Sequence, residues 1–280
     1  MKIFLTGGTG FIGSHFINVA HKNGHEVFAL RRLGSLSRIK LNKEPIWING
    51  SLDGNYVKEL SKCDIYIHLA TFGASPQPSN WSECFYWNVI KSVELLKQAL
   101  DSGINKVISV GTYAEYGKSG MNYEFIPPNC PLSPEGPYAA SKAAFGIAMR
   151  SICAEYDSYS IYYRLFSIFG DGQNEKNFYP AVKKAALSGN DFSMTKGEQI
   201  RDFFPVDLAV KQICEGIKFE NVGINETKIL NIGSGTPRSV LKFAQDNWIK
   251  FKAKGKLNVG SLPYRKNEIM RYVAYISRNN

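Results

Sequence analysis

Short apolar runs alternate with stretches of helical periodicity along the first 166 residues. The runs are bounded by glycine and polar residues and predict buried strands at 2–6, 26–30, 64–70, 106–111 and 160–166. Between them, apolar residues recur at helical spacing at 12–20, at 89–100 and from about 138 into the 150s. This alternation predicts right-handed βαβ crossovers and a Rossmann-type, doubly wound parallel α/β sheet.

The pattern changes after Phe166, where Gly, Pro and Asn interrupt shorter elements. We expect a smaller C-terminal lobe there, interleaved with the last strand and helix of the sheet domain. The predicted sheet domain takes residues 1–166 plus about 206–234, and the predicted smaller lobe takes residues 167–205 and 235–280.

The composition excludes several classes of protein. The chain has 280 residues, of which 44% are hydrophobic and 21% charged, as in a globular protein with its own core. No apolar run approaches the ~20 residues of a membrane span, and the N-terminus lacks the apolar region of a secretion signal. Five dispersed cysteines without CxxC, and four histidines without HExxH, predict no disulfide framework and no metal site. We therefore expect a cytoplasmic protein without membrane attachment.

The net charge of +10 is compatible with three kinds of surface. It fits a nucleic-acid-binding surface, a surface that favours solubility, or a pocket for small phosphorylated ligands. Lysines and arginines are spread along the chain with no run longer than two, which argues against nucleic acid as a partner. Charge alone does not decide between the other two.

Three glycines stand between the first predicted strand and helix, in GGTGFIG (7–13). Gly7 permits a tight turn, Gly10 lets the backbone approach a pyrophosphate, and Gly13 lets the helix pack closely on the strand. The helix N-terminus then presents N–H groups and its positive dipole end to phosphates. A simple tight turn would also use glycines, but the strand–turn–helix context favours a dinucleotide-binding loop.

The end of the second strand, about 20 residues further on, reads the adenosine ribose in such a domain. An acidic side chain there accepts from the 2′-hydroxyl of NAD, but this chain has Arg31 and Arg32, with Ser35 close behind. Guanidinium groups fit a 2′-phosphate, although a solvated pair of loop arginines is the alternative. The sequence therefore predicts NADPH rather than NAD as the cofactor.

Tyr138 and Lys142 in YAASK lie one helical turn apart, and Thr112 stands just past the strand 106–111, at the ligand-binding edge of the sheet. A nearby ammonium lowers the pKa of a phenol from about 10. Tyr138 could then donate a proton to the alkoxide that forms as hydride reaches a ketone, while Thr112 orients the same oxygen. A Tyr–Lys pair at this spacing alone is usually a solvent-exposed pair without a catalytic role. Together with the glycine loop and Thr112, it predicts a catalytic set.

These motifs, in this order, resemble the extended short-chain dehydrogenase/reductases, the NAD(P)-dependent sugar epimerase/dehydratase/reductase family. The likeness covers nearly the whole chain and rests on GGTGFIG (7–13), HLA (68–70), Asn88, SVGTYAEYG (109–117), YAASK (138–142), YRLFSIFGDGQ (163–173), RDFFPVDLA (201–209) and ILNIGSGTPRSV (229–240). By this resemblance Thr112, Tyr138 and Lys142 are catalytic and Asn88 opens the central helix. The resemblance also implies a homodimer, packed through the helices near 85–102 and 138–155.

The resemblance further implies which residues bind the cofactor and the substrate. The cofactor residues are Gly7, Thr9, Gly10, Phe11, Ile12, Gly13, Arg31, Arg32, Ser35, Leu52, Leu69, Ala70, Tyr138 and Lys142. The residues for a nucleotide-sugar substrate are Phe72, Asn88, Thr112, Asn177, Arg201 and Arg265, with Gly73, Ala74 and Ser75 beside Phe72. The chain departs from the family at Ser51, where many relatives have Asp for the adenine, at Ser167 in place of Asn, and at Thr71 in place of Ala.

Residues near Thr112 distinguish the reactions of this family. The 4,6-dehydratases carry an Asp–Glu pair directly after the catalytic Thr, where this chain has Tyr113 and Ala114. No Cys lies between Cys84 and Cys130, which argues against the GDP-fucose synthase type. KGEQIRDF (196–203) and YRKNEIM (264–270) resemble nucleotide-diphosphate 4-keto-6-deoxyhexose reductases, in particular CDP-abequose and CDP-paratose synthases, whose matching arginines lie near the substrate diphosphate. A structural ion pair is the alternative for each of these arginines.

The sequence therefore predicts an NADPH-dependent enzyme that reduces the C4 ketone of a nucleotide-linked 4-keto-6-deoxyhexose, for surface polysaccharide or glycoconjugate synthesis. A nucleotide-sugar epimerase that uses NAD(P) is the alternative within the fold. A catalytically silent dinucleotide-binding regulator is the alternative of a different class, and the presence of Thr112, Tyr138 and Lys142 argues against it. The nucleotide base and the sugar configuration stay open at this point.

Overall fold

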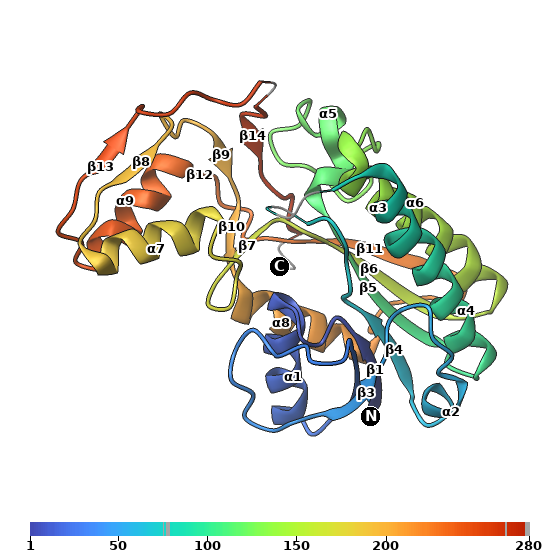
Figure 1. Cartoon of the computed structure of the whole chain (residues 1–280). Helices are drawn as coiled ribbons and strands as arrows, with labels where there is room; N and C mark the ends of the chain where they lie inside the picture. The colour runs from blue at the N-terminus through green and yellow to red at the C-terminus, as the bar shows by residue number, and fades with distance from the viewer. Residues whose placement is uncertain (75, 77–78, 267, 278–280) are drawn as a thin grey trace.

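The protein is described by a computed structural model that covers residues 1–74, 76, 79–266 and 268–277. Its centre is a seven-stranded parallel sheet with the strand order β11-β6-β5-β4-β1-β2-β3 (Figure 1). The strands are β1 (Lys2–Thr6), β2 (Glu26–Arg31), β3 (Ile46–Asn49), β4 (Ile65–His68), β5 (Lys106–Thr112), β6 (Tyr159–Leu165) and β11 (Thr227–Ile232). The strand order reverses between β1 and β4, which confirms the doubly wound Rossmann-type sheet.

Helices cover both faces of this sheet. Along β1, Ile3 and Leu5 point into the core of one face and Phe4 into the core of the other, as a period of two requires. The first face is covered by α1 (Phe11–Lys22) and α8 (Val206–Glu215), and the second by α4 (Ser92–Asp101) and α6 (Gly136–Glu155) (Figure 1). Burial on both faces explains why the strands are continuous apolar runs in the sequence.

The central helix begins earlier than we expected. It starts as α3 (Trp81–Phe85), continues through a π-helical turn at Tyr86–Lys91 and passes into α4. Asn88 therefore does not open the helix, and that expectation was wrong. It lies inside the π-helical turn, where the wider winding places its side chain in the interior, 2% exposed.

A smaller group of elements stands beside the sheet, at the left of Figure 1. It contains α7 (Phe178–Ser188), α9 (Val240–Lys250) and the parallel pair β8 (Phe192–Met194) and β13 (Leu257–Val259). The rings of Phe203 and Phe243 stack here, with their centroids 3.7 Å apart. α8 packs on one face of the large sheet and β11 is one of its strands, although both lie between these smaller elements in sequence. The exact boundary between two domains stays a prediction.

Short strands and the C-terminal segment join the two parts. β7 (Ser167–Phe169) pairs with β10 (Phe203–Pro205), and β9 (Ile200–Arg201) pairs with β12 (Arg238–Ser239) and β14 (Arg271–Tyr272). The Tyr272 hydroxyl donates to the Gly117 carbonyl oxygen at 2.7 Å. The remaining helical turns are α2 (Val57–Leu60), α5 (Gly117–Gly120) and the 3₁₀ turns Tyr113–Tyr116 and Gly216–Lys218. Among the residues described, every helix is too short or too polar to span a bilayer.

Candidate active site

The turn between β1 and α1 is shaped by contacts among its glycines. Gly7 has a φ of +74°, and a Cβ atom on it would lie 2.6 Å from the amide nitrogen of Ala70. A Cβ atom on Gly13 would overlap the carbonyl oxygen of Gly7, so the first turn of α1 packs directly on the loop. α1 follows Gly10, which has no side chain to cap it. The first N–H groups of the helix are therefore available to a phosphate, as a dinucleotide site requires.

The other residues expected at the cofactor lie on this turn or on neighbouring strand ends. Thr9, Phe11 and Ile12 belong to the turn and the start of α1, Leu69 and Ala70 follow β4, and half-buried Leu52 follows β3. The parallel register sets Thr6 beside His68, and the Ala70 amide donates to the Thr6 hydroxyl at 3.3 Å. The ends of β1 and β4 are thus brought together beneath the glycine turn, while the cofactor contacts themselves stay predictions.

The two arginines that follow β2 have different surroundings. Arg31 donates from Nε to Asn49 Oδ1 at 3.0 Å, and its guanidinium lies 4.6 Å from the centroid of the Trp47 ring. Arg32 is exposed, and its carbonyl oxygen accepts from the amide of half-buried Ser35 at 3.0 Å. Arg31 is therefore held against the edge strand, and Arg32 is the cation accessible to a ligand. The sequence pattern missed Trp47 and Asn49 because β3 has only four residues.

Thr112, Tyr138 and Lys142 meet at the carboxyl end of β5. Thr112 is the last residue of β5, and Tyr138 and Lys142 lie in the first turns of α6. The Tyr138 hydroxyl lies near the hydroxyls of Thr112 and Thr71. Lys142 is buried, with Nζ 5.9 Å from the centroid of the Phe145 ring. The residue at 71, a Thr where the family has Ala, adds a second hydroxyl to this cluster.

Burial shifts the pKa values of Tyr138 and Lys142 in opposite directions. Removal from water, and then the charge of Glu115, raises the pKa of Tyr138 above its ordinary value. Burial lowers the pKa of Lys142 to about 8, and the charge of Glu115 partly opposes this effect. We expected Lys142 to lower the pKa of Tyr138, and this expectation was wrong, because the pKa is raised. Tyr138 keeps its proton at neutral pH, which suits a proton donor.

Asn88 connects the loop after β4 to the helix that carries Tyr138. Its Oδ1 accepts from the Phe72 amide at 2.7 Å, and its Nδ2 donates to the Phe72 carbonyl oxygen and the Ser141 hydroxyl, both at 3.0 Å. Ser141 in turn donates to the Tyr138 carbonyl oxygen at 2.9 Å. Because these bonds occupy both ends of its amide in the interior, Asn88 positions Phe72 and α6. That Asn88 also contacts the substrate stays a prediction.

The two arginines expected at the substrate diphosphate, Arg201 and Arg265, differ in exposure. Arg201 donates from Nη2 to Glu268 Oε1 at 3.0 Å and to the Ile269 carbonyl oxygen at 2.6 Å. Arg201 therefore forms the structural ion pair that was the alternative for it, and its role at a diphosphate stays a prediction. Arg265 is exposed.

Two further substrate predictions fall on loops. Asn177 precedes α7, and its side chain makes no capping hydrogen bond to that helix. Phe72 is half-buried after β4, next to Gly73 and Ala74, whereas Ser75 lies outside the described residues. None of these roles goes beyond a prediction.

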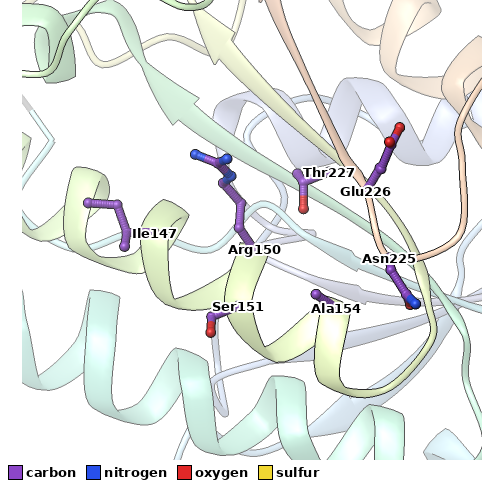
Figure 2. A pocket seen from close by; sticks show the side chains of 7 residues that line it. All are labelled: Ile147, Arg150, Ser151, Ala154, Asn225, Glu226 and Thr227. Carbon is purple, nitrogen blue, oxygen red and sulfur yellow. The ribbon is translucent and has the colours of Figure 1, made fainter.

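A recess of about 510 Å³ lies on the outer side of α6, away from this site (Figure 2). It is lined by Ile147, Arg150, Ser151 and Ala154 of α6 and by Asn225, Glu226 and Thr227 at the start of β11. None of the expected catalytic or cofactor residues lines it. The recess is therefore not part of the candidate active site.

The chain is similar to known proteins in sequence and in fold. The sequence profile described as "NAD dependent epimerase/dehydratase family" matches residues 3–233. UDP-glucose 4-epimerase of Corynebacterium glutamicum is 26% identical over 261 residues, which cover 86% of this chain and 77% of the relative. CDP-abequose synthase of Salmonella muenchen is 25% identical over 279 residues, which cover 96% and 87%. UDP-N-acetylglucosamine 4-epimerase from Methanobrevibacter ruminantium M1, solved in complex with UDP-N-acetylmuramic acid, has a TM-score of 0.87 at 24% identity and covers 99% of this chain and 89% of that one.

Proposed function

Because the chain belongs to the NAD dependent epimerase/dehydratase family, we propose that it reduces the C4 ketone of a nucleotide-diphosphate 4-keto-6-deoxyhexose with NADPH. One observation carries the proposal: Thr112 at the end of β5 lies near the Tyr138 hydroxyl, one helical turn from buried Lys142, at the same edge of the sheet as the glycine turn after β1. The similarity to CDP-abequose synthase over 96% of the chain supports a sugar nucleotide as the substrate.

Each catalytic residue has one part in the proposed reaction. The uncapped start of α1 and the glycine cradle fit a dinucleotide, and NADPH supplies the hydride when bound. Thr112 orients the ketone oxygen by a hydrogen bond. Tyr138 donates its proton to that oxygen, so that the phenol O–H bond breaks as the new hydroxyl forms. Lys142, in its ammonium form, stabilises the phenolate left behind until solvent returns a proton.

The residues after Thr112 favour a reductase over a dehydratase. Tyr113 and Ala114 offer no carboxyl group for eliminating water. The next residue, Glu115, is fully buried, and its Oε2 lies 2.8 Å from Arg164 Nε. A carboxylate held in this way cannot reach a sugar, so the acid–base pair of a dehydratase is missing at these positions.

A nucleotide-sugar epimerase is the second candidate, favoured by the similarity to UDP-glucose 4-epimerase. An epimerase returns the hydride it removes and holds its cofactor throughout. An exposed Arg32 beside the expected ribose position fits NADPH, a cofactor that a reductase consumes and exchanges. We also propose a homodimer through the helices near 85–102 and 138–155, supported by the exposure of Ile90 (49%) and Ile147 (59%) on them.

We expect Arg32→Ala to weaken NADPH binding by about 10- to 100-fold and to leave NADH binding nearly unchanged. The reason is that a guanidinium bonded to a phosphate contributes about 1.5–3 kcal/mol, and NADH has no 2′-phosphate. Quenching of tryptophan fluorescence gives both dissociation constants. Arg150→Ala, on the outer side of α6, is the matched control and should change neither. Equal losses for the two cofactors would rule out Arg32 as a reader of the 2′-phosphate.

The proposed reaction is tested by the loss of NADPH absorbance with CDP-, dTDP- and GDP-linked 4-keto-6-deoxyhexoses, with NADH run in parallel. We expect stoichiometric oxidation of NADPH with one of them, which also identifies the nucleotide. Interconversion of sugar isomers without net oxidation, including that of UDP-glucose, would replace the reductase by an epimerase. If neither cofactor nor sugar changes while NADPH still binds, the proposal of an enzyme fails in favour of a regulator.

A further inference from the structure

A buried ion pair lies directly behind the catalytic residues. Glu115, in the 3₁₀ turn after β5, is 0% exposed, and Arg164, in β6, is 5% exposed. Arg164 Nε donates to Glu115 Oε2 at 2.8 Å. A buried ion pair is often no more stabilising than apolar residues of the same volume. Stability alone therefore gives no sufficient reason for a carboxylate at this position, and the proposed reaction does not use it directly.

The other oxygen of Glu115 is bonded directly to the end of β5 and is linked to α6 through the hydroxyl of Tyr162. Oε1 accepts from the Thr112 amide at 2.8 Å. It also lies 2.9 Å from the Tyr162 hydroxyl, which is 3.0 Å from the Lys142 carbonyl oxygen. The Tyr162 hydroxyl has one proton, so it is shared between these two acceptors. One carboxylate thus connects the end of β5 to the start of α6.

Two glycines leave the space that this network occupies. A Cβ atom on Gly111 would overlap Glu115 Oε1 and the Tyr162 hydroxyl. A Cβ atom on Gly146 would lie 2.9 Å from Cζ of Tyr162. Larger residues at either position would displace the carboxylate or the phenol, so the local sequence accommodates the network at two separate elements, β5 and α6.

We propose that Glu115 is a positioning residue of this site, which holds the main chain of Thr112 and, through Tyr162, that of Lys142 in one arrangement, and supplies the negative charge that Lys142 faces. The roles of Thr112 and Lys142 rest on the proposed function. The network and its effect on Lys142 do not, and they can be tested without a substrate.

The charge on Lys142 depends on few neighbours. Burial lowers the pKa of His68, on β4, to about 3, so this imidazole is neutral at neutral pH. Burial and Glu115 raise the pKa values of Tyr138 and Tyr162, and burial raises the pKa of Tyr116 to about 12, so these phenols are also neutral. Among the described residues, the charged group that shifts the pKa of Lys142 is then Glu115.

We expect Glu115→Gln to move the titration of Lys142 to lower pH by about one unit. A negative charge favours the ammonium form, and burial already lowers the pKa of Lys142 to about 8, so losing that charge lowers it further. NMR of protein labelled with ¹³C-lysine follows this titration with no substrate present, and Lys142→Met assigns the resonance. The same shift is expected on the basic limb of kcat/KM for NADPH oxidation, with a lower kcat.

Two further variants separate charge from structure. Glu115→Gln leaves Arg164 buried without its partner, so Glu115→Gln/Arg164→Met removes both charges and should show the same downward shift in a folded protein. Glu115→Asp keeps the negative charge, so Lys142 should still titrate near pH 8 in this variant, with a reduced kcat. Glu94→Gln, at the Lys91–Glu94 pair on the surface, is the control that should change neither the Lys142 midpoint nor kcat. An unmoved Lys142 midpoint in the folded Gln variants would overturn the proposal. A moved midpoint in a protein that oxidises no NADPH would uphold it and overturn only the proposed reaction.

Discussion

Tyr138→Phe is expected to lower kcat for NADPH oxidation by about 10²- to 10⁴-fold, the range for loss of a positioned proton donor. The substitution removes the hydroxyl that lies against Thr112 and Thr71 and keeps the ring in place. Because the ring still fills the same space, NADPH should bind with nearly unchanged affinity. Steady-state kinetics measure the first effect, and fluorescence titration with NADPH measures the second.

A matched control lies at the other end of the same helix. The Tyr156 hydroxyl donates to Asp101 at 2.7 Å, far along α6 from Tyr138. Tyr156→Phe removes an equivalent phenol and should leave kcat unchanged. Near-normal turnover of Tyr138→Phe would mean that another group donates the proton, and the assignment of Tyr138 would fail.

Gly13→Ala is expected to lower NADPH affinity by about 100-fold or more, because losing two amide hydrogen bonds to a charged pyrophosphate, at about 1.5–3 kcal/mol each, has that effect. The new methyl group would overlap the Gly7 carbonyl oxygen, and that loop already packs on Ala70. The loop would have to open, which moves its amides away from a pyrophosphate. The free energy of unfolding should also fall, by about 3 kcal/mol, as for an overpacked core. NADPH titration and urea denaturation measure the two effects.

Gly223→Ala provides the comparison for this substitution. A Cβ atom there would approach only the carboxylate end of Glu226, a flexible side chain. Stability and NADPH affinity should both stay close to those of the unaltered protein. If Gly13→Ala bound NADPH as tightly as Gly223→Ala, the turn after β1 would not be the pyrophosphate site.

Local rules were sufficient for the sheet and for the parts of the site built from neighbouring residues. Parallel strands covered on both faces must be apolar throughout, so β1, β4 and β5 are visible as runs. The glycine turn depends on a positive φ at Gly7 and on contact between Gly7 and Gly13, both within one loop. Tyr138 and Lys142 share a helix face because they are four residues apart.

Tertiary contacts decided what these side chains can do. Asn88 bonds to Ser141, 53 residues away, and therefore positions α6 instead of opening a helix. Arg201 pairs with Glu268, 67 residues away, and Arg31 is held by the unpredicted strand β3. The capping pattern Thr-x-x-Glu at 112–115 was visible in the sequence. The ion-pair partner of Glu115, Arg164, lies 49 residues further on, and only the fold brings the two together.

The sequence by itself determined the sheet, the turn and the catalytic residue types, because each follows from the periodicity or sterics of adjacent residues. Only the tertiary structure decided which side chains of the site are charged and which are already hydrogen-bonded within the protein. Burial lowers the pKa of Lys142 to about 8 while Glu115 opposes it, and this balance depends on which distant groups the fold removes from water together.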